Sequence, residues 1–273
     1  MKIGIIGAGM VGGTIEHCFD DHHELYIHDP SRNTDLETLI SNCGMAYIAV
    51  PTPPRDDGSC DTSIVEEVLE ELPDGFIAVI KSTVIPGTTQ LLQEKYPTLK
   101  LAYSPEFLVE RRRFKDFANQ KILVVGTMYK EVADMVFEQH RIAGIDVGEN
   151  KFHTSSTEAE MVKYTKNNFY AMKVVFANQM YDLCQSIGVE WDVVREIITT
   201  PQDQPIGVSH LEPMMGLMRG FGGKCLPKDT LALRELARIN SVDYDILDAI
   251  QSDNSALRKI STGKTSDVVT EDD

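Results

Sequence analysis

The sequence predicts an α/β fold, in which a doubly wound parallel sheet is followed by an all-helical part with one long helix. Three observations support this class. Short, continuously apolar runs recur through the first half of the chain, with segments of helical length between them, as is typical of strands buried on both faces of a parallel sheet. A glycine-rich turn directly follows the first run. Beyond about residue 155, the alternation of apolar runs and helix-length segments ends, and a long uninterrupted helical segment follows.

The expected strands are the apolar runs themselves, at residues 3–6, 25–27, 45–50, 76–80, 101–103 and 122–125. Helices of the first half are expected in the segments between them, around residues 11–20, 62–72, 87–95 and 130–142. Because ligands of open α/β sheets bind beyond the carboxyl ends of the strands, we expect a site in the loops that follow the strands.

The second half begins with a helix-start pattern, in which Ser and Thr at residues 154–157 precede Glu158. No Pro or Gly then occurs before Gly188, so one long helix is expected from about 157 to 186. Shorter helices are expected near 190–199, 229–239 and 243–260, around a Pro- and Gly-rich loop at 201–223. We therefore expect a sheet domain (1–155), a helical domain (156–260) and a disordered acidic tail (261–273).

The charge balance argues against nucleic acid as a partner. Of the 273 residues, 26 are Lys or Arg and 42 are Asp or Glu, which gives a net charge of −16, whereas non-specific nucleic-acid binding depends on cation–phosphate contacts. No apolar run reaches the ~18 residues that span a bilayer, and the glycine-rich start does not resemble a secretory signal. The five cysteines include no Cys-x-x-Cys pair. We therefore expect no metal site, no disulfide framework and a cytoplasmic location.

A dinucleotide site is predicted after the first expected strand. The hexapeptide Gly7-Ala8-Gly9-Met10-Val11-Gly12 has the G-x-G-x-x-G spacing, which permits a tight turn and lets backbone N–H groups approach a pyrophosphate at a helix N-terminus. Asp29 ends the second expected strand, where a carboxylate would bind the adenosine ribose hydroxyls. This acid favours NAD over NADP, because it would repel a 2′-phosphate. The first domain is therefore predicted to be Rossmann-like and to bind NAD.

Two further loops are expected near the same cofactor. Val50, Pro51 and Thr52 follow the third expected strand, and Ser82 and Thr83 follow the fourth. Their hydroxyls can bond the cofactor or a water. The alternative is that Pro and the Ser and Thr side chains only stabilise the loops themselves.

Two pairs of polar residues suited to chemistry occur further along the chain. Glu106 and Glu110 follow the fifth expected strand. Lys163 and Asn167 lie at i and i+4 on the long helix, hence on one face. Taken alone, each pair could equally be solvated surface.

A cysteine with a special setting lies near the end of the chain. Cys225 stands between the glycine-rich residues 220–223 and an expected helix start, with Asp229 four residues beyond. Nearby N–H groups and lysines can hold a thiol in that setting as a thiolate. Of the other four cysteines, Cys18, Cys43 and Cys184 are expected to be small buried hydrophobic residues, and Cys60 a bystander on a polar loop.

Together these motifs resemble those of the UDP-glucose/GDP-mannose dehydrogenase family, the nucleotide-sugar 6-dehydrogenases. The matching segments occur in the family's order and cover residues 1 to about 260: GAGMVG, VPTP, KSTVIPGT, SPEFLVE, the KYTKN pair and GFGGKCLPKD. The resemblance implies a four-electron oxidation, in which the C6 alcohol of a nucleotide sugar becomes an acid and two NAD are reduced. The LPKD segment suits the UDP-glucose and GDP-mannose branches, of which we favour UDP-glucose.

The resemblance also implies a role for each site residue. Cys225 matches the nucleophile that forms a thiohemiacetal and then a thioester, while Lys163 and Asn167 match the pair that stabilises the oxyanion. Asp229 and a Thr83-bound water match the proton-transfer groups. Glu110 matches the acid of thioester hydrolysis. Further implied cofactor contacts are Glu110 and Lys228, and the implied substrate contacts are Glu106, Phe107, Leu108, Glu110, Lys163, Asn167, Gly222 and Cys225.

The resemblance further implies a homodimer built on the helical domain, and a product that feeds surface polysaccharides. Typical members continue into a third domain that binds part of the nucleotide, and the sequence ends before it, so a short form is expected. Lys163, Arg219 and Lys228 are the candidate cations for an anionic cofactor and sugar nucleotide. Two alternatives stay open: a two-electron 3-hydroxyacid dehydrogenase, which needs no cysteine, and a non-catalytic NAD-binding module.

Overall fold

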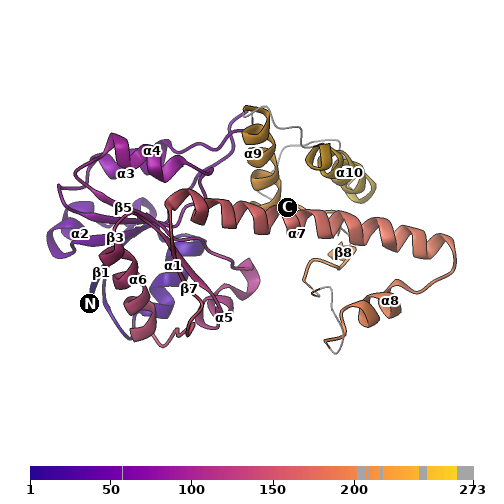
Figure 1. Cartoon of the computed structure of the whole chain (residues 1–273), viewed down its shortest axis with the longest axis horizontal. Coiled ribbons are helices and arrows are strands. Elements are labelled where there is room, and N and C mark those ends of the chain that lie inside the picture. Colours follow the sequence, from indigo (N-terminus) through magenta and orange to yellow (C-terminus); the bar gives the residue numbers. More distant parts are fainter. Residues whose placement is uncertain (57, 202–206, 208, 216–217, 240–244, 263–273) are drawn as a thin grey trace. The chain divides into compact units, whose positions relative to one another are not determined.

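A computed structural model describes residues 1–56, 58–201, 207, 209–215, 218–239 and 245–262 (Figure 1). All but the first two residues of the expected acidic tail lie outside these ranges. The chain divides into two compact units, Met1–Arg55 with Cys60–Lys163, and Asp56–Ser59 with Tyr164–Asp273. The boundary expected at residue 155 is where the long helix starts, and the units divide further along, within that helix.

The first unit contains a sheet of seven strands within the described residues, in the order β2-β1-β3-β4-β5-β6-β7. Neighbouring strands are parallel except for β5 and β6, which pair antiparallel through Tyr103 and Gly126. The chain leaves β1 toward β2 on one side and then continues with β3 on the other, so the strand order reverses between β1 and β3. The strands are β1 (Lys2–Ile6), β2 (Glu24–His28), β3 (Met45–Ile48), β4 (Ile77–Ile80), β5 (Lys100–Tyr103), β6 (Leu123–Gly126) and β7 (Lys151–Thr154).

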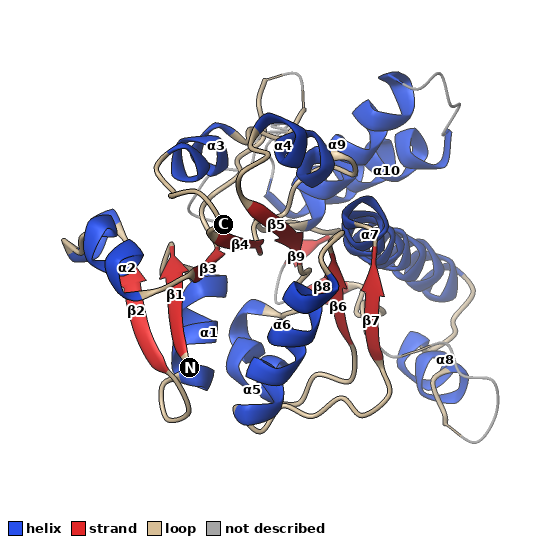
Figure 2. Ribbon diagram, turned by 60° about the vertical axis from the view of Figure 1, so that its left-hand side comes forward, coloured by secondary structure: helices blue, strands red, loops and turns tan. Residues whose placement is uncertain are grey.

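Helices cover both faces of this sheet, as Figure 2 shows. Alternate residues of a strand point to opposite faces, and the core accordingly has two apolar layers. Ile3 and Ile5 of β1 belong to one layer with Phe19, while Ile6 belongs to the other with Leu39. The first layer is covered by α1 (Met10–Phe19), α5 (Arg113–Ala118) and α6 (Lys130–Ile142), and the second by α2 (Leu36–Asn42), α3 (Ser63–Glu70) and α4 (Thr88–Lys95). The prediction of a doubly wound α/β sheet is confirmed.

Three elements of this unit were not expected from the sequence. Strand β7 lies at the edge of the sheet, and most of its residues are exposed, so it has no continuous apolar run. Helices α2 and α5 have only seven and six residues, too few to show a clear helical period. The antiparallel β5–β6 pair was also missed, because apolar runs do not encode strand direction.

The second unit consists mainly of helices. The long helix α7 (Ser156–Ser186) starts in the first unit and continues through the second (Figure 1). Its start has the expected capping pattern: the Glu158 N–H donates to Ser155 Oγ at 3.2 Å, and the Ser155 N–H donates back to Glu158 Oε2 at 2.9 Å. The other elements are α8 (Trp191–Ile198), the short antiparallel strands β8 (Met214–Met215) and β9 (Met218–Arg219), α9 (Leu226–Ile239) and α10 (Asp245–Thr262).

The helices of the second unit enclose a small core of their own, formed by Ala177, Cys184, Trp191 and Leu211. Within the described residues, none of the helices combines the length and apolar character that crossing a bilayer requires.

Candidate functional site

The glycine turn lies between β1 and α1, at the point where the strand order reverses. Gly7 has a φ of +87°, and a Cβ there would lie 2.6 Å from the Ala49 carbonyl oxygen. A Cβ on Gly12 would lie 1.8 Å from the Gly7 carbonyl oxygen, so this position needs glycine for α1 to pack against the strand. A Cβ on Gly9 would meet no atom within 4 Å. The turn therefore leaves open space at Gly9, where a pyrophosphate would approach the backbone, and it fits NAD.

Asp29 lies beside this turn, as predicted. The Ala8 N–H donates to its Oδ2 at 2.6 Å, and the Ser31 hydroxyl donates to its Oδ1 at 2.6 Å. The hydrogen bond from Ser31, followed by that from Ala8, lowers the pKa of the carboxyl below its usual value. Arg32, the nearby cation, pairs with Glu16 at 2.8 Å. A carboxylate with its own donors at this position favours ribose hydroxyls over a 2′-phosphate.

The loops after β3 and β4 are hydrogen-bonded to each other. The Thr52 hydroxyl donates to the Thr83 carbonyl oxygen at 2.7 Å, and the Ser82 hydroxyl donates to the Val50 carbonyl oxygen at 2.7 Å. Cys60 also contributes, because its Sγ lies 3.4 Å from the Thr83 carbonyl oxygen and its side chain is buried. Cys60 was expected to be a bystander on a polar loop, and the structure shows its side chain buried in the packing of that loop. In this structure, the Thr52 and Ser82 hydroxyls therefore stabilise the loops themselves, which is the alternative that the sequence left open.

The two glutamates after β5 have opposite environments. Glu106 is 4% exposed, and its carboxylate forms a buried ion pair with Lys81, which also donates to Ser104 Oγ at 3.0 Å. Glu110 is exposed, at the start of a short 3₁₀ turn (Glu110–Arg112). Glu106 is thus a neutralised structural acid, and Glu110 is the accessible one. Lys81 was missed as a site residue, although a lysine directly continuing a buried strand is a detectable signal.

Lys163 is bound to the same segment through the backbone. Its Nζ donates to the Glu106 carbonyl oxygen at 2.5 Å and lies 5.9 Å from the centre of the Phe107 ring. Leu108, the next residue, packs against the apolar layer of α1 and α6. The structure therefore brings Lys163 together with the segment after β5.

A buried carboxylate connects α7 to the N-terminus of α4. The Glu160 oxygens accept hydrogen bonds from the Gly87 N–H at 2.6 Å and the Thr89 N–H at 2.8 Å. Burial raises the pKa of Glu160 to about 7, although these hydrogen bonds act in the opposite direction. Glu160 was not predicted, because the sequence does not indicate which distant backbone groups it contacts.

In the second unit, Cys225 immediately precedes the first residue of α9, Leu226. Its carbonyl oxygen accepts the Asp229 N–H at 2.9 Å, the first hydrogen bond of the helix. Gly220 and Gly223 adopt φ values of +73° and +75°, which explains the glycines of the turn. Cys225 is exposed, whereas Cys18 is half-buried and Cys43, Cys60 and Cys184 are buried. Burial raises the pKa of Cys18, and that of Cys43 to about 11, so both stay protonated thiols.

Asp229 lies one turn into α9 and is 1% exposed. Its Oδ2 accepts a hydrogen bond from Asn167 Nδ2 at 2.5 Å, and Lys228 Nζ lies 3.5 Å from its Oδ1. Asn168, the residue after Asn167 on α7, donates to the Asp229 carbonyl oxygen at 3.3 Å. The second unit thus brings together the predicted Asn167, Lys228 and Asp229, and adds Asn168, which the sequence did not single out.

Arg219 has partners within its own unit. It donates to Asp182 Oδ2 at 2.7 Å and to Asn178 Oδ1 at 3.1 Å. These bonds hold β9 against α7, so the expected role of Arg219 as an anion-binding cation is not supported by its position.

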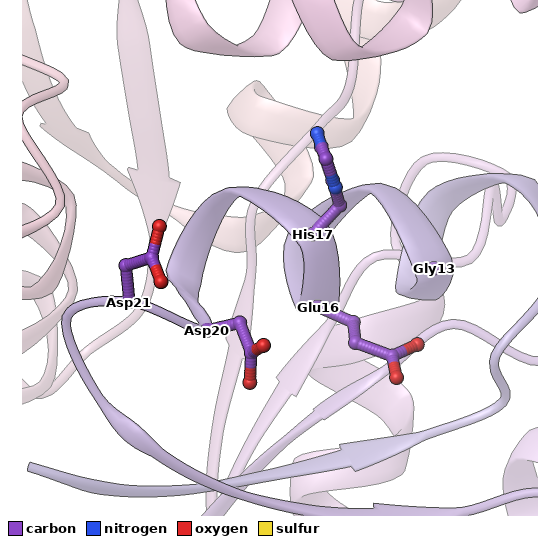
Figure 3. Close-up of a pocket in the computed structure, with 5 residues that line it drawn as sticks. All are labelled: Gly13, Glu16, His17, Asp20 and Asp21. Carbon is purple, nitrogen blue, oxygen red and sulfur yellow. The ribbon is translucent and has the colours of Figure 1, made fainter.

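A hollow of 400 Å³ lies along α1, lined by Gly13, Glu16, His17, Asp20 and Asp21 (Figure 3). The side chains of Glu16 and Asp20 point to one side of the helix and that of His17 to the other (Figure 3). Three carboxylates repel an anionic ligand, so we do not assign the cofactor to this hollow. Within the described residues, the structure contains no group of three His, Cys, Asp or Glu side chains that could hold a metal ion.

Comparisons with known proteins identify the family. The model of the NAD binding domain of the UDP-glucose/GDP-mannose dehydrogenase family matches residues 29–143. The model of the same family's central domain matches residues 157–256. A UDP-glucose 6-dehydrogenase of Haloferax volcanii is 30% identical, over 91% of this chain and 68% of its own. That of Rickettsia bellii is 32% identical, over 85% of this chain and 54% of its own. A solved UDP-glucose dehydrogenase from Pyrobaculum islandicum has a TM-score of 0.79 at 27% identity, covering 93% of this chain and 68% of that one.

The sheet and its glycine turn define an NAD-binding α/β protein with a helical second unit. The chain belongs to the UDP-glucose/GDP-mannose dehydrogenase family. It spans about half the length of the Rickettsia relative, 54%. The resemblance stated from the motifs is confirmed, and NAD as the cofactor is confirmed through the family's NAD binding domain.

Proposed function

We propose that this protein oxidises the C6 alcohol of a nucleotide sugar to the carboxylic acid, with UDP-glucose as the favoured substrate and UDP-glucuronate as the product. The relatives named above support this substrate through their own names. The single observation that carries the proposal is the setting of Cys225, an exposed thiol at the start of α9, with the buried Asp229–Asn167 pair one turn further on.

NAD would be held by the glycine turn and by Asp29. The backbone at Gly9 is open to a pyrophosphate, and Met10 and Val11 form the first turn of α1, whose N-terminus favours negative charge. Pro51, Thr83, Glu110 and Lys228 are proposed as additional contacts. When bound at this turn, NAD would supply the hydride acceptor for both oxidations.

Cys225 is proposed as the nucleophile of the second oxidation. Its sulfur adds to the carbonyl carbon of the sugar aldehyde and forms a thiohemiacetal, whose oxidation leaves a thioester. Water then attacks the thioester carbon and the carbon–sulfur bond breaks, which releases the acid and regenerates the Cys225 thiol. The helix N-terminus beside Cys225 supplies backbone N–H groups that favour the thiolate as nucleophile and as leaving group.

Polar groups from both units are proposed to stabilise charge and to transfer protons. Lys163 and Asn167 lie one turn apart on α7, and a cation and an amide on one helix face suit the stabilisation of a developing oxyanion. Asp229, with Thr83 and a water, is proposed for proton transfer from the alcohol. Glu110 is proposed as the acid of thioester hydrolysis. Glu106 has no proton-transfer role in this proposal, because its carboxylate is paired with Lys81.

The proposal is tested by NADH formation with a panel of nucleotide sugars. We expect two NADH per UDP-glucose, and we expect Cys225→Ala to lose formation of the acid. A ratio near one with a 3-hydroxyacid as the better substrate would favour the two-electron alternative. No turnover with any sugar, while NAD still binds, would favour the non-catalytic module.

We also propose a cytoplasmic homodimer built on the helical unit, whose product feeds surface polysaccharides. Phe169 and Phe176 are seven residues apart on α7, and they are 52% and 46% exposed. Two large apolar side chains at this spacing lie on one helix face and suit a subunit interface. Light scattering is expected to give the mass of a dimer, and a monomer across the tested concentrations would contradict the interface.

A further inference from the structure

The glycine turn before Cys225 is held from one side by a single asparagine of α10. Asn254 Oδ1 accepts a hydrogen bond from the Phe221 N–H at 2.7 Å, and its Nδ2 donates to the Phe221 carbonyl oxygen at 3.0 Å. One side-chain amide thus satisfies both backbone polar groups of one residue, as a neighbouring strand would. Asn254 is 8% and Phe221 3% exposed, so both bonds are shielded from water.

The backbone of the turn lies directly against the same face of α10. A Cβ on Gly220 would be 2.4 Å from Asn254 Oδ1 and 3.3 Å from the Leu257 Cβ, and a Cβ on Gly222 would be 2.7 Å from a guanidinium nitrogen of Arg258. Asn254, Leu257 and Arg258 are spaced i, i+3 and i+4, hence neighbours on one helix face. Gly220 is therefore favoured at this contact with α10, where a Cβ would also meet the Leu257 Cβ, and Gly220 and Gly223 are favoured by their left-handed φ values.

Only three residues separate Phe221, which Asn254 holds, from Cys225. A Cβ on Gly223 would meet no atom within 4 Å, so this position has room for a side chain, and glycine is favoured there by its φ of +75°. Downstream, the Cys225 carbonyl oxygen is held by the Asp229 N–H. Helix α10 supports this side too, because Gln251 Nε2 donates to Thr230 Oγ1, next to Asp229. On the upstream side of Cys225, the bonds between Asn254 and Phe221 act together with the contact of Gly220 and Gly222 with α10.

We propose that Asn254 is a positioning residue that holds the turn at residues 220–223 so that the Cys225 thiol stays at the N-terminus of α9. The proposal rests on the role proposed for Cys225 as the nucleophile. Asn254 lies outside all the motifs that the sequence singled out, and its partner, Phe221, is 33 residues away. Its contribution acts through the position of the sulfur and involves no contact with substrate or cofactor.

The test measures the reactivity of Cys225 in Asn254→Ala, with no need for turnover. The 273-residue protein is treated with iodoacetamide from pH 6 to 10, and alkylation of Cys225 is followed by mass spectrometry. We expect the pH of half-maximal rate to rise by up to about 0.7 unit, which is roughly the effect of a helix N-terminus on a nearby charge. Because a shift of about 0.7 unit changes the thiolate fraction by up to about 5-fold, kcat with UDP-glucose is expected to fall by up to about 5-fold. KM for NAD is expected to change little, because all of its proposed contacts except Lys228 lie in the first unit.

Gln179→Ala is the matched control. It removes a side-chain bond of 2.6 Å to Asp253, the neighbour of Asn254 on α10, and leaves Phe221 untouched. If Asn254→Ala does not fold, Asn254→Asp, which keeps the acceptor for the Phe221 N–H, is measured in the same way. An alkylation profile identical to wild type, or an equal shift in Gln179→Ala, would overturn the proposal. A shifted profile in a protein that oxidises no nucleotide sugar would leave the positioning role intact and refute the proposed function.

Discussion

Replacing Glu160 by glutamine is expected to remove a pH-dependent loss of stability from the first unit. The Glu160 carboxyl is fully buried, and burial raises its pKa from an ordinary value of 4.5 to about 7. Between these two values, the folded protein keeps the proton that the unfolded chain has released. The free energy of unfolding therefore decreases as the pH rises across this window. It is at its highest below pH 4.5, and the loss is complete above about pH 7.

The size of the effect follows from the shift. A difference between 4.5 and about 7 corresponds to about 3 kcal/mol, at about 1.36 kcal/mol per pKa unit. Glutamine has no proton to release, so this slope disappears in Glu160→Gln. The amide nitrogen faces one of the two N–H donors of Gly87 and Thr89, and losing that hydrogen bond costs about 1–3 kcal/mol at every pH. The pH dependence, and not the stability at one pH, is therefore the diagnostic quantity.

The assay is urea unfolding of wild type and variant from pH 4 to 9, followed by circular dichroism and by hydrogen exchange of the strands of the first unit. Because all other groups titrate equally in both proteins, the difference between the two curves isolates Glu160. Glu158→Gln is the control, since Glu158 lies on the same helix but is exposed, with a pKa lowered mainly by its hydrogen bond from the Ser155 N–H. Parallel curves for wild type and Glu160→Gln between pH 5 and 8 would refute the reasoning.

Two further predictions concern the same unit. Gly12→Ala is expected to destabilise the protein by about 1–3 kcal/mol and to abolish NAD binding, because its Cβ would overlap the Gly7 carbonyl oxygen. Gly9→Ala is expected to weaken NAD binding alone, so equal melting temperatures for the two variants would contradict the turn geometry. Lys81→Met is expected to cost about 3–5 kcal/mol, because it leaves the Glu106 carboxylate buried without its partner. Adding Glu106→Gln should recover most of that loss in chemical denaturation, and no recovery would show that the pair is not the cause.

How much of the fold could be predicted depended on burial. Runs such as residues 45–50 and 76–80 became strands because a central parallel strand is apolar on both faces. Strand β7 could not be found in this way, because it is an exposed edge strand whose pairing with β6 supplies the stability. Strand direction was missed at β6 for a related reason, since hydropathy does not record which way a strand runs.

The candidate site was likewise only partly predictable, because some of its features are local in sequence and others depend on distant residues. The settings of Cys225 and of the glycine turn are local in sequence, so residue type and spacing were enough to predict them. Lys81, Glu160 and Asn254 act through polar partners that are far away along the chain. Nothing in their own neighbourhoods identifies those partners, and only the folded chain shows them.

The difference in exposure between Cys225 and the other cysteines also determines which cysteine reacts first with oxidants. Peroxide reacts with accessible thiolates first, so sulfenic acid is expected to form at Cys225 before any other position. The other cysteine of the same unit, Cys184, is buried in the core beside Trp191. Within that unit, an oxidised Cys225 therefore has no accessible thiol with which to form a protective disulfide. Small thiols such as glutathione are expected to rescue it, and without them oxidation should proceed to the irreversible sulfinic acid.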